Sequence, residues 1–152
     1  MAITAADVNK LRQQTGAGMM DCKNALVEAN GDFEAAVDVL RKKGQKVAAK
    51  RGENEASEGL IFAQTTTDGK TGVLLTLNCE TDFVAKNDTY RNFVQSLMDI
   101  ALNNLPASSE ELKALKYDDK LTVEEKITEQ VGVIGEKLDL SGYAVVKGDT
   151  VV

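Results

Sequence analysis

The chain has 152 residues, of which 43% are hydrophobic and 28% charged, and its net charge is −6, as expected for one soluble domain or two small ones. It contains no histidine, and its two cysteines, Cys22 and Cys79, are far apart, so the usual general base, nucleophile–histidine pairs and zinc ligands are missing. We therefore expect no enzymatic activity, no metal site and no cofactor.

No hydrophobic run reaches the roughly 18 residues of a membrane span, and the N-terminus lacks the apolar stretch of a signal peptide. These features predict a cytoplasmic protein without a membrane partner. An acidic chain binds phosphate backbones poorly, so we also expect no nucleic-acid partner. Reduced thiols are the default in the cytosol, although a disulfide between Cys22 and Cys79 stays open.

Residues 1–44 predict three short amphipathic helices joined by tight turns. The first helix follows the candidate N-cap Thr4 and stops at the glycine turn of residues 15–18. The second runs from about Met19 to Ala29, and the third follows Asp32 and is closed by Gly44. The expected apolar stripes are Val8 and Leu11; Met19, Cys22, Ala25, Leu26 and Ala29; and Phe33, Ala36, Val37 and Leu40.

Two features of this first region have more than one interpretation. Met20 lies off the apolar stripe beside a glycine turn, which suits an adaptable contact surface, but packing against the first helix or simple exposure fits equally. Residues 41–51 form a basic run, which predicts either a patch for RNA or an acidic partner, or a solvated and partly helical linker. The linker is favoured because no aromatic residues are interleaved to stack on bases. We expect the domain boundary there.

The region after residue 58 predicts a small sheet followed by helices. Residues 59–67 read as a strand, Asp68-Gly69 as a two-residue hairpin turn, and residues 71–79 as a second strand. The face expected to be buried carries Val73, Leu75, Leu77 and Cys79.

A long helix is expected from Asp88 to Asn104, with Pro106 just after its end. Ser108 with Glu111 and Thr122 with Glu125 match capping boxes, which open helices to Lys116 and about Lys137. The expected stripes are Tyr90, Phe93, Val94, Leu97 and Ala101; and Val123, Ile127, Val131, Ile134 and Leu138. Residues 143–146 predict a third strand, and Val151-Val152 the opening of another, which suggests a fragment of a longer chain.

Residues 79–87 join the second strand to the long helix and bring the carboxylate of Asp82 next to the aromatic ring of Phe83. Such a pair on a loop between rigid elements is well placed to meet another molecule. The alternative is that Asp82 starts a helix and Phe83 lies in the core. The residues alone favour that second interpretation slightly.

Four segments together resemble the elongation factor Ts family of bacterial translation. They are LRQQTGAGMMDCKNAL (residues 11–26), NGDFEAA (30–36), LRKKG (40–44) and ETDFVAKN (80–87). Their order and spacing make the resemblance specific, and it covers essentially the whole chain. It implies an α+β fold: a ubiquitin-associated-like (UBA-like) three-helix bundle with a basic linker at 1–54, and at 55–152 the first half of the family's core, with a small antiparallel sheet packed on helices.

The resemblance implies guanine nucleotide exchange on elongation factor Tu, in its GDP-bound and nucleotide-free forms. Arg12, Met19 and Met20 would dock on a helix of the GTPase, and the segment of Thr81, Asp82, Phe83 and Val84 would intrude near its magnesium and nucleotide. Two alternatives remain: an interaction module without exchange activity, and RNA binding through the basic run. The sequence also leaves a homodimer open.

Overall fold

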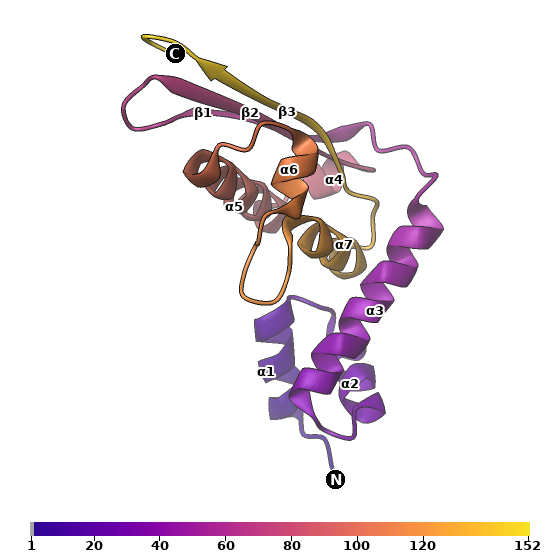
Figure 1. Ribbon diagram of the computed structural model, residues 1–152. Helices are drawn as coiled ribbons and strands as arrows, with labels where there is room; N and C mark the ends of the chain where they lie inside the picture. The colour runs from indigo at the N-terminus through magenta and orange to yellow at the C-terminus, as the bar shows by residue number, and fades with distance from the viewer. Residues whose placement is uncertain (1) are drawn as a thin grey trace. The chain divides into compact units, whose positions relative to one another are not determined.

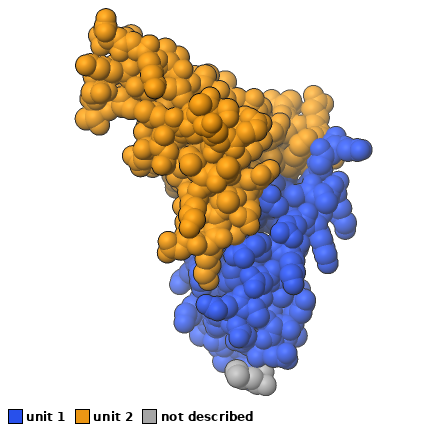
Figure 2. Space-filling model, in the orientation of Figure 1, with its two compact units in different colours: residues 1–53, 128–136 blue, residues 54–127, 137–152 orange. Residues whose placement is uncertain are grey.

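The computed structural model describes residues 2–152, which form seven helices and a three-stranded antiparallel sheet, confirming the predicted α+β class (Figure 1). The chain divides into two compact units (Figure 2). Of the described residues, unit 1 comprises 2–53 and 128–136, and unit 2 comprises 54–127 and 137–152.

Unit 1 contains α1 (Ala5–Thr15), α2 (Met19–Glu28) and α3 (Phe33–Arg51). Thr4 caps α1 as predicted: its hydroxyl accepts from the Asp7 backbone, and the Asp7 carboxylate accepts from the Thr4 backbone. Gly16 ends α1 in a left-handed conformation (φ 73°), which glycine adopts without strain. The buried core is made by Val8, Leu11, Ala17, Cys22, Ala25, Leu26 and Ala36.

The predicted end of the third helix at Gly44 is wrong, because α3 continues without a break to Arg51. A glycine ends a helix when it takes a positive φ, and Gly44 does not. Gly44 instead lies where the backbone of residues 128–132 crosses α3, and an added Cβ would stand 3.1 Å from the Thr128 carbonyl oxygen. The residues assigned to a linker are therefore helical through Arg51.

Met19 does not belong to the buried stripe of α2, which corrects a second expectation. Its side chain is 55% exposed, whereas Cys22, Ala25 and Leu26 are buried. Met19 is the first residue of α2, and it lines a surface groove between the starts of α1 and α2. Helical spacing therefore identified the apolar stripe of α2, but it did not show that burial begins at Cys22 and excludes Met19.

The sheet of unit 2 has the order β1 (Glu58–Thr65), β2 (Thr71–Cys79) and β3 (Asp139–Lys147), with both pairs antiparallel. The buried face of β2 consists, as predicted, of Val73, Leu75, Leu77 and Cys79. The turn of the hairpin is longer than the expected two residues. The last hydrogen bond between the strands runs from the Thr66 N–H to the Thr71 carbonyl oxygen at 2.8 Å, which leaves residues 67–70 in the turn. The strand β3 starts four residues before the prediction, and residues 151–152 are not in a strand.

The other helices are α4 (Asp82–Ala85), α5 (Asp88–Asn104), α6 (Ser109–Ala114) and α7 (Val123–Ile134). The limits of α5 and its apolar stripe match the prediction, and the Ser108 and Thr122 hydroxyls cap α6 and α7 as expected. Both α6 and α7 end earlier than expected, α6 at Ala114 and α7 at Ile134. Figure 1 shows α5 and α6 on one side of the sheet, where their apolar residues complete the core of unit 2.

Candidate protein-docking site

The short helix α4 presents Phe83 to solvent. The Thr81 hydroxyl caps it by accepting from the Val84 N–H at 3.4 Å. Successive residues of a helix are rotated by about 100° around its axis, so Phe83 and Ala85, two positions apart, point to nearly opposite sides of α4. Ala85 is buried, and Phe83 is 83% exposed. The expectation that places Phe83 in the core is therefore wrong, and the ring is available to another molecule.

Asp82 lies beside Phe83 and carries the negative charge of this segment. Its carboxylate is half exposed and pairs with the Lys86 ammonium at 2.8 Å, one helical turn away. The hydrogen bond from Lys86, and then its charge, lower the pKa of Asp82 below the ordinary 3.8. Asp82 is therefore ionised at neutral pH. Its pairing with Lys86 could have been predicted from the sequence, because the two residues are four positions apart on a helix.

The junction that carries α4 is tied to the core of unit 2. The Cys79 thiol donates to the Thr81 carbonyl oxygen at 3.2 Å. The buried Tyr90 hydroxyl donates to the Leu77 carbonyl oxygen at 2.5 Å and so fastens α5 to β2. Burial of Val84 is partial, and Ala85 anchors the inner side of α4. An exposed ring on a fixed base loses little conformational freedom on binding, which favours tight association.

The second group of predicted docking residues lies in unit 1. Met19 and Met20 are 55% and 63% exposed and line the groove between the starts of α1 and α2. Arg12 is exposed on α1, four residues after Val8, which lines the same groove. Val8 itself is buried in the core, and Arg12 is not among the residues that line the groove. The structure thus brings Met19 and Met20, two flexible apolar side chains, to one groove, and Arg12 is a separate exposed cation of unit 1.

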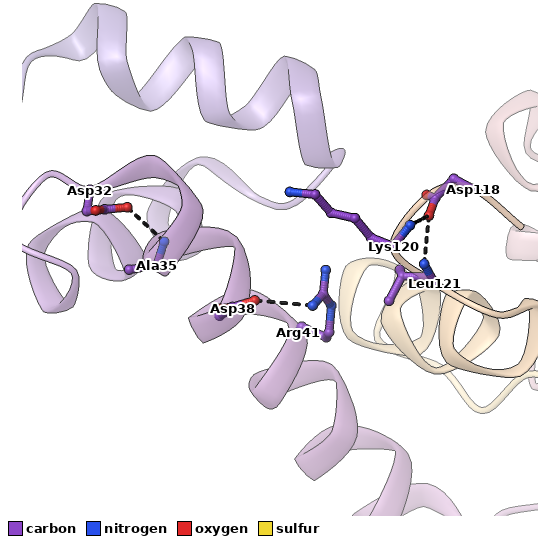
Figure 3. Close-up of polar contacts among 7 residues, drawn as sticks. All are labelled: Asp32, Ala35, Asp38, Arg41, Asp118, Lys120 and Leu121. Atoms are coloured by element: carbon purple, nitrogen blue, oxygen red, sulfur yellow. Dashed lines mark hydrogen bonds and ion pairs between the residues drawn. The ribbon is translucent and has the colours of Figure 1, made fainter. Parts of the chain in front are cut away.

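The basic run is partly neutralised by carboxylates within unit 1. Arg41 pairs with Asp38 at 3.1 Å, as Figure 3 shows, and Lys43 pairs with Asp21 of α2. Asp38 and Asp21 therefore reduce the net positive charge that this part of α3 can offer to a phosphate backbone. Figure 3 also shows Asp32 capping α3 through the Ala35 N–H.

Within residues 2–152, no cluster of three or more histidine, cysteine or acidic side chains is arranged to hold a metal ion. The two thiols, Cys22 and Cys79, are buried in different units. None of the helices described has the length and apolar character needed to cross a bilayer. Each unit carries exposed apolar side chains suited to protein contacts, Met19 and Met20 in unit 1 and Phe83 in unit 2.

Comparison with known proteins identifies the class as bacterial translation elongation factors. The chain is 58% identical over 142 residues to an elongation factor Ts of Christiangramia forsetii, covering 93% of this chain and 50% of that protein. It is 51% identical over 152 residues to that of Amoebophilus asiaticus, covering 100% of this chain and 54% of that protein. The chain therefore spans about half the length of the curated relatives it matches.

The family model described as "Elongation factor TS" matches residues 80–152, a range that begins at the junction carrying Asp82 and Phe83. A third relative, from Cytophaga hutchinsonii, is 52% identical over 150 residues, which cover 99% of this chain and 54% of that protein. The chain belongs to the elongation factor Ts family, which confirms the resemblance found in its motifs.

Proposed function

We propose that this chain promotes guanine nucleotide exchange on elongation factor Tu by binding its GDP-bound form and accelerating GDP release. The observation that carries the proposal is the 83% exposed ring of Phe83, held on a capped helix beside the ionised Asp82. Family membership supports it. The proposal assigns residues 1–54 to a UBA-like domain that docks the GTPase, and residues 55–152 to a core subdomain that disturbs its nucleotide site.

The exchange step needs no covalent chemistry from this chain. Magnesium joins the nucleotide phosphates to a GTPase through a small set of protein groups and waters, so a small displacement of those groups weakens nucleotide binding. In the proposed complex, Phe83 enters between helices of the GTPase and Asp82 perturbs the ligands around its magnesium. Thr81 and Val84 flank the pair and complete the contact.

Exchange is a coupling between two ligands of one GTPase. If the chain weakens GDP binding, GDP must weaken binding of the chain by the same factor. A coupling of roughly 1,000-fold corresponds to about 4 kcal/mol. Burial of one phenylalanine supplies roughly 1.5–3 kcal/mol. The proposed mechanism therefore needs further contacts, and we assign them to Arg12, Met19 and Met20.

The alternative function is a protein-interaction module that binds the GTPase without accelerating exchange. It is favoured by one observation: the chain spans about half the length of its relatives, whose remaining half can supply contacts of its own. The two functions differ in a single measurement. Binding of the chain to elongation factor Tu with an unchanged GDP release rate supports the interaction module, and saturable acceleration of release supports exchange.

A homodimer and RNA binding are the remaining proposals for partners. Sedimentation at increasing protein concentration tests the homodimer. RNA binding that falls steeply with salt, and disappears when Lys42, Lys43 and Lys46 are neutralised, would support the RNA alternative. The net charge of −6 and the ion pairs of Arg41 and Lys43 argue against RNA. We further propose that the chain meets elongation factor Tu in the cytoplasm.

A further inference from the structure

Glu80 joins three segments of unit 2 that are far apart in sequence. One of its carboxylate oxygens, Oε1, accepts from the Lys137 backbone N–H at 2.7 Å and from the Asn54 side-chain Nδ2 at 3.2 Å. The Lys137 ammonium in turn donates to the Asn54 carbonyl oxygen at 3.1 Å. The segment before β1, the junction between β2 and α4, and the link between α7 and β3 therefore meet at Glu80.

These contacts are not required to form α4 itself. Thr81 supplies the helix cap, and the hydrogen bonds within the helix run from Ala85 to Thr81 and from Lys86 to Asp82. The Glu80 side chain instead bonds the backbone of Lys137, which lies 57 residues later in the sequence. A carboxylate that accepts from a backbone N–H forms a charge-assisted hydrogen bond, which is stronger than a neutral one.

Glu80 lies three residues before Phe83, so its hydrogen bonds affect the direction in which Phe83 points. The strand β2 ends at Cys79, so residues 80–81 are the hinge between the sheet and α4. The Cys79 thiol holds the hinge at the Thr81 carbonyl oxygen, and Glu80 holds it on a separate segment. Two attachments at neighbouring residues restrict rotation of α4 and hence the direction in which Phe83 points.

We infer that Glu80 is a positioning residue for Phe83: its hydrogen bonds to Lys137 and Asn54 fix the orientation of α4, and so the direction of Phe83, within the complex with the GTPase. This inference rests on the proposed function. A positioning residue aims the wedge without touching the nucleotide site. Its loss should therefore lower the maximal rate of exchange more than it changes the concentration of chain needed for half-maximal effect.

The test compares Glu80→Ala and Glu80→Gln in the full chain, with release of fluorescent GDP from elongation factor Tu as the readout. Glu80→Ala should lower the maximal rate at least fivefold, with the half-saturating concentration within twofold of wild type. Glu80→Gln keeps a carbonyl oxygen that can accept from Lys137 and should retain at least half of the maximal rate. An unchanged Glu80→Ala would overturn the inference. So would a Glu80→Gln as slow as Glu80→Ala, because an acceptor oxygen at this position would then be no better than a methyl group.

Asp68→Ala is the matched control. The Asp68 carboxylate also accepts from a backbone N–H, that of Lys70 at 3.0 Å, but it lies in the β1–β2 hairpin, at the other end of the strands from Cys79. Its maximal rate should stay within twofold of wild type. A loss equal to that of Glu80→Ala would assign the effect to general loosening of unit 2 and overturn the positioning role.

Amide hydrogen exchange separates this inference from the proposed function, because it needs no partner. Glu80→Ala should speed exchange at least fivefold at the Lys137, Ala85 and Lys86 amides, and Asp68→Ala should not. If the wild-type chain fails to accelerate GDP release, the proposed function fails, and these amides still decide whether Glu80 orders α4. Unchanged amides would overturn the inference.

Asn54→Asp keeps the inference testable if Glu80→Ala does not fold. It places a second carboxylate against Glu80 and removes the Nδ2 donor while leaving Glu80 in place. The maximal rate should fall at least threefold. A rate equal to that of wild type would count against the inference.

Discussion

Gly132 of α7 lies directly against Gly44 of α3, so that a Cβ added to Gly132 would stand 2.5 Å from the Gly44 Cα and 3.0 Å from its nitrogen. Real side chains do not approach backbone atoms so closely. Two helices can touch through their backbones only where both lack side chains. This contact within unit 1 accounts for a glycine in the middle of α3, because a side chain at Gly44 would crowd the backbone of residues 128–132.

Gly132→Ala should destabilise unit 1 by about 1–3 kcal/mol, because the backbones must separate to admit the methyl group. Urea unfolding followed by circular dichroism measures the change. Gly52→Ala at the end of α3 is the matched control, since its Cβ would meet only ordinary contacts, the nearest at 3.5 Å. That variant should be neutral or slightly stabilising. Equal losses in the two variants would contradict the contact between the helices.

Phe83→Ala should lower the maximal rate of GDP release about tenfold or more, because it removes the proposed wedge. Its free energy of unfolding should change by less than about 0.5 kcal/mol, since an 83% exposed ring contributes little to the core. Stopped-flow release of fluorescent GDP and urea unfolding measure the two quantities. Ile61→Ala, which shortens another exposed apolar side chain (68%), should change neither. Unchanged release by Phe83→Ala would remove the wedge from the mechanism.

Asp82→Asn should slow exchange less than Phe83→Ala does. The carboxamide keeps the shape of Asp82 and can still accept a hydrogen bond from Lys86, whereas the ion pair is lost. The same release assay compares the two variants at saturating concentration. A larger loss for Asp82→Asn would show that the charge near the partner's magnesium, and not the apolar wedge, dominates exchange.

The lowered pKa of Asp82 fixes the direction of its pH dependence. A carboxyl group whose pKa is lower in the folded than in the unfolded chain stabilises the fold above its unfolded pKa. That contribution is lost as the pH falls from the ordinary 3.8 through the lower folded value. The Asp82–Lys86 pair should therefore persist between pH 5 and 8 and open only in stronger acid. An NMR titration of the Asp82 carboxyl carbon with a midpoint above 3.8 would contradict this assignment.

Met20→Ala should raise the half-saturating concentration of the chain about three- to tenfold and leave the maximal release rate nearly unchanged. The proposed contact of Met20 serves docking and not displacement of the nucleotide, so it contributes equally before and during exchange. A concentration series of the release assay separates the two constants. Val27→Ala is the control, because Val27 is also exposed (57%) and lies two turns along α2. A lower maximal rate for Met20→Ala would give Met20 a role beyond docking.

Sequence patterns predicted the elements best where the local signal and the packing agree. The helix α5 has an Asn87 cap, a continuous apolar stripe and Pro106 beyond its end, and its limits match the prediction. Gly44 misled the interpretation because a glycine marks both helix ends and close contacts between helices. Which of the two applies depends on Gly132, 88 positions later (132 − 44), and local sequence does not contain that information.

For the docking residues too, the local sequence predicted one part of the structure and the packing decided the other. The local sequence predicted that residues 79–87 join a strand to a helix, but it slightly favoured a core position for Phe83, and the resemblance to the family reversed this. The exposure of Phe83 follows from the burial of Ala85, which only the packing of α4 decides. The role of Glu80 was also out of reach, because its partners Asn54 and Lys137 are brought together by the fold.

Exchange by this chain is tested by the release rate of fluorescent GDP from elongation factor Tu, measured over a range of concentrations of the chain. The rate should rise with the concentration of the chain and saturate, and Phe83→Ala at the same concentrations should lower the plateau. A release rate that stays at its intrinsic value at every concentration, while the chain binds the GTPase in a pull-down, would contradict exchange by this chain.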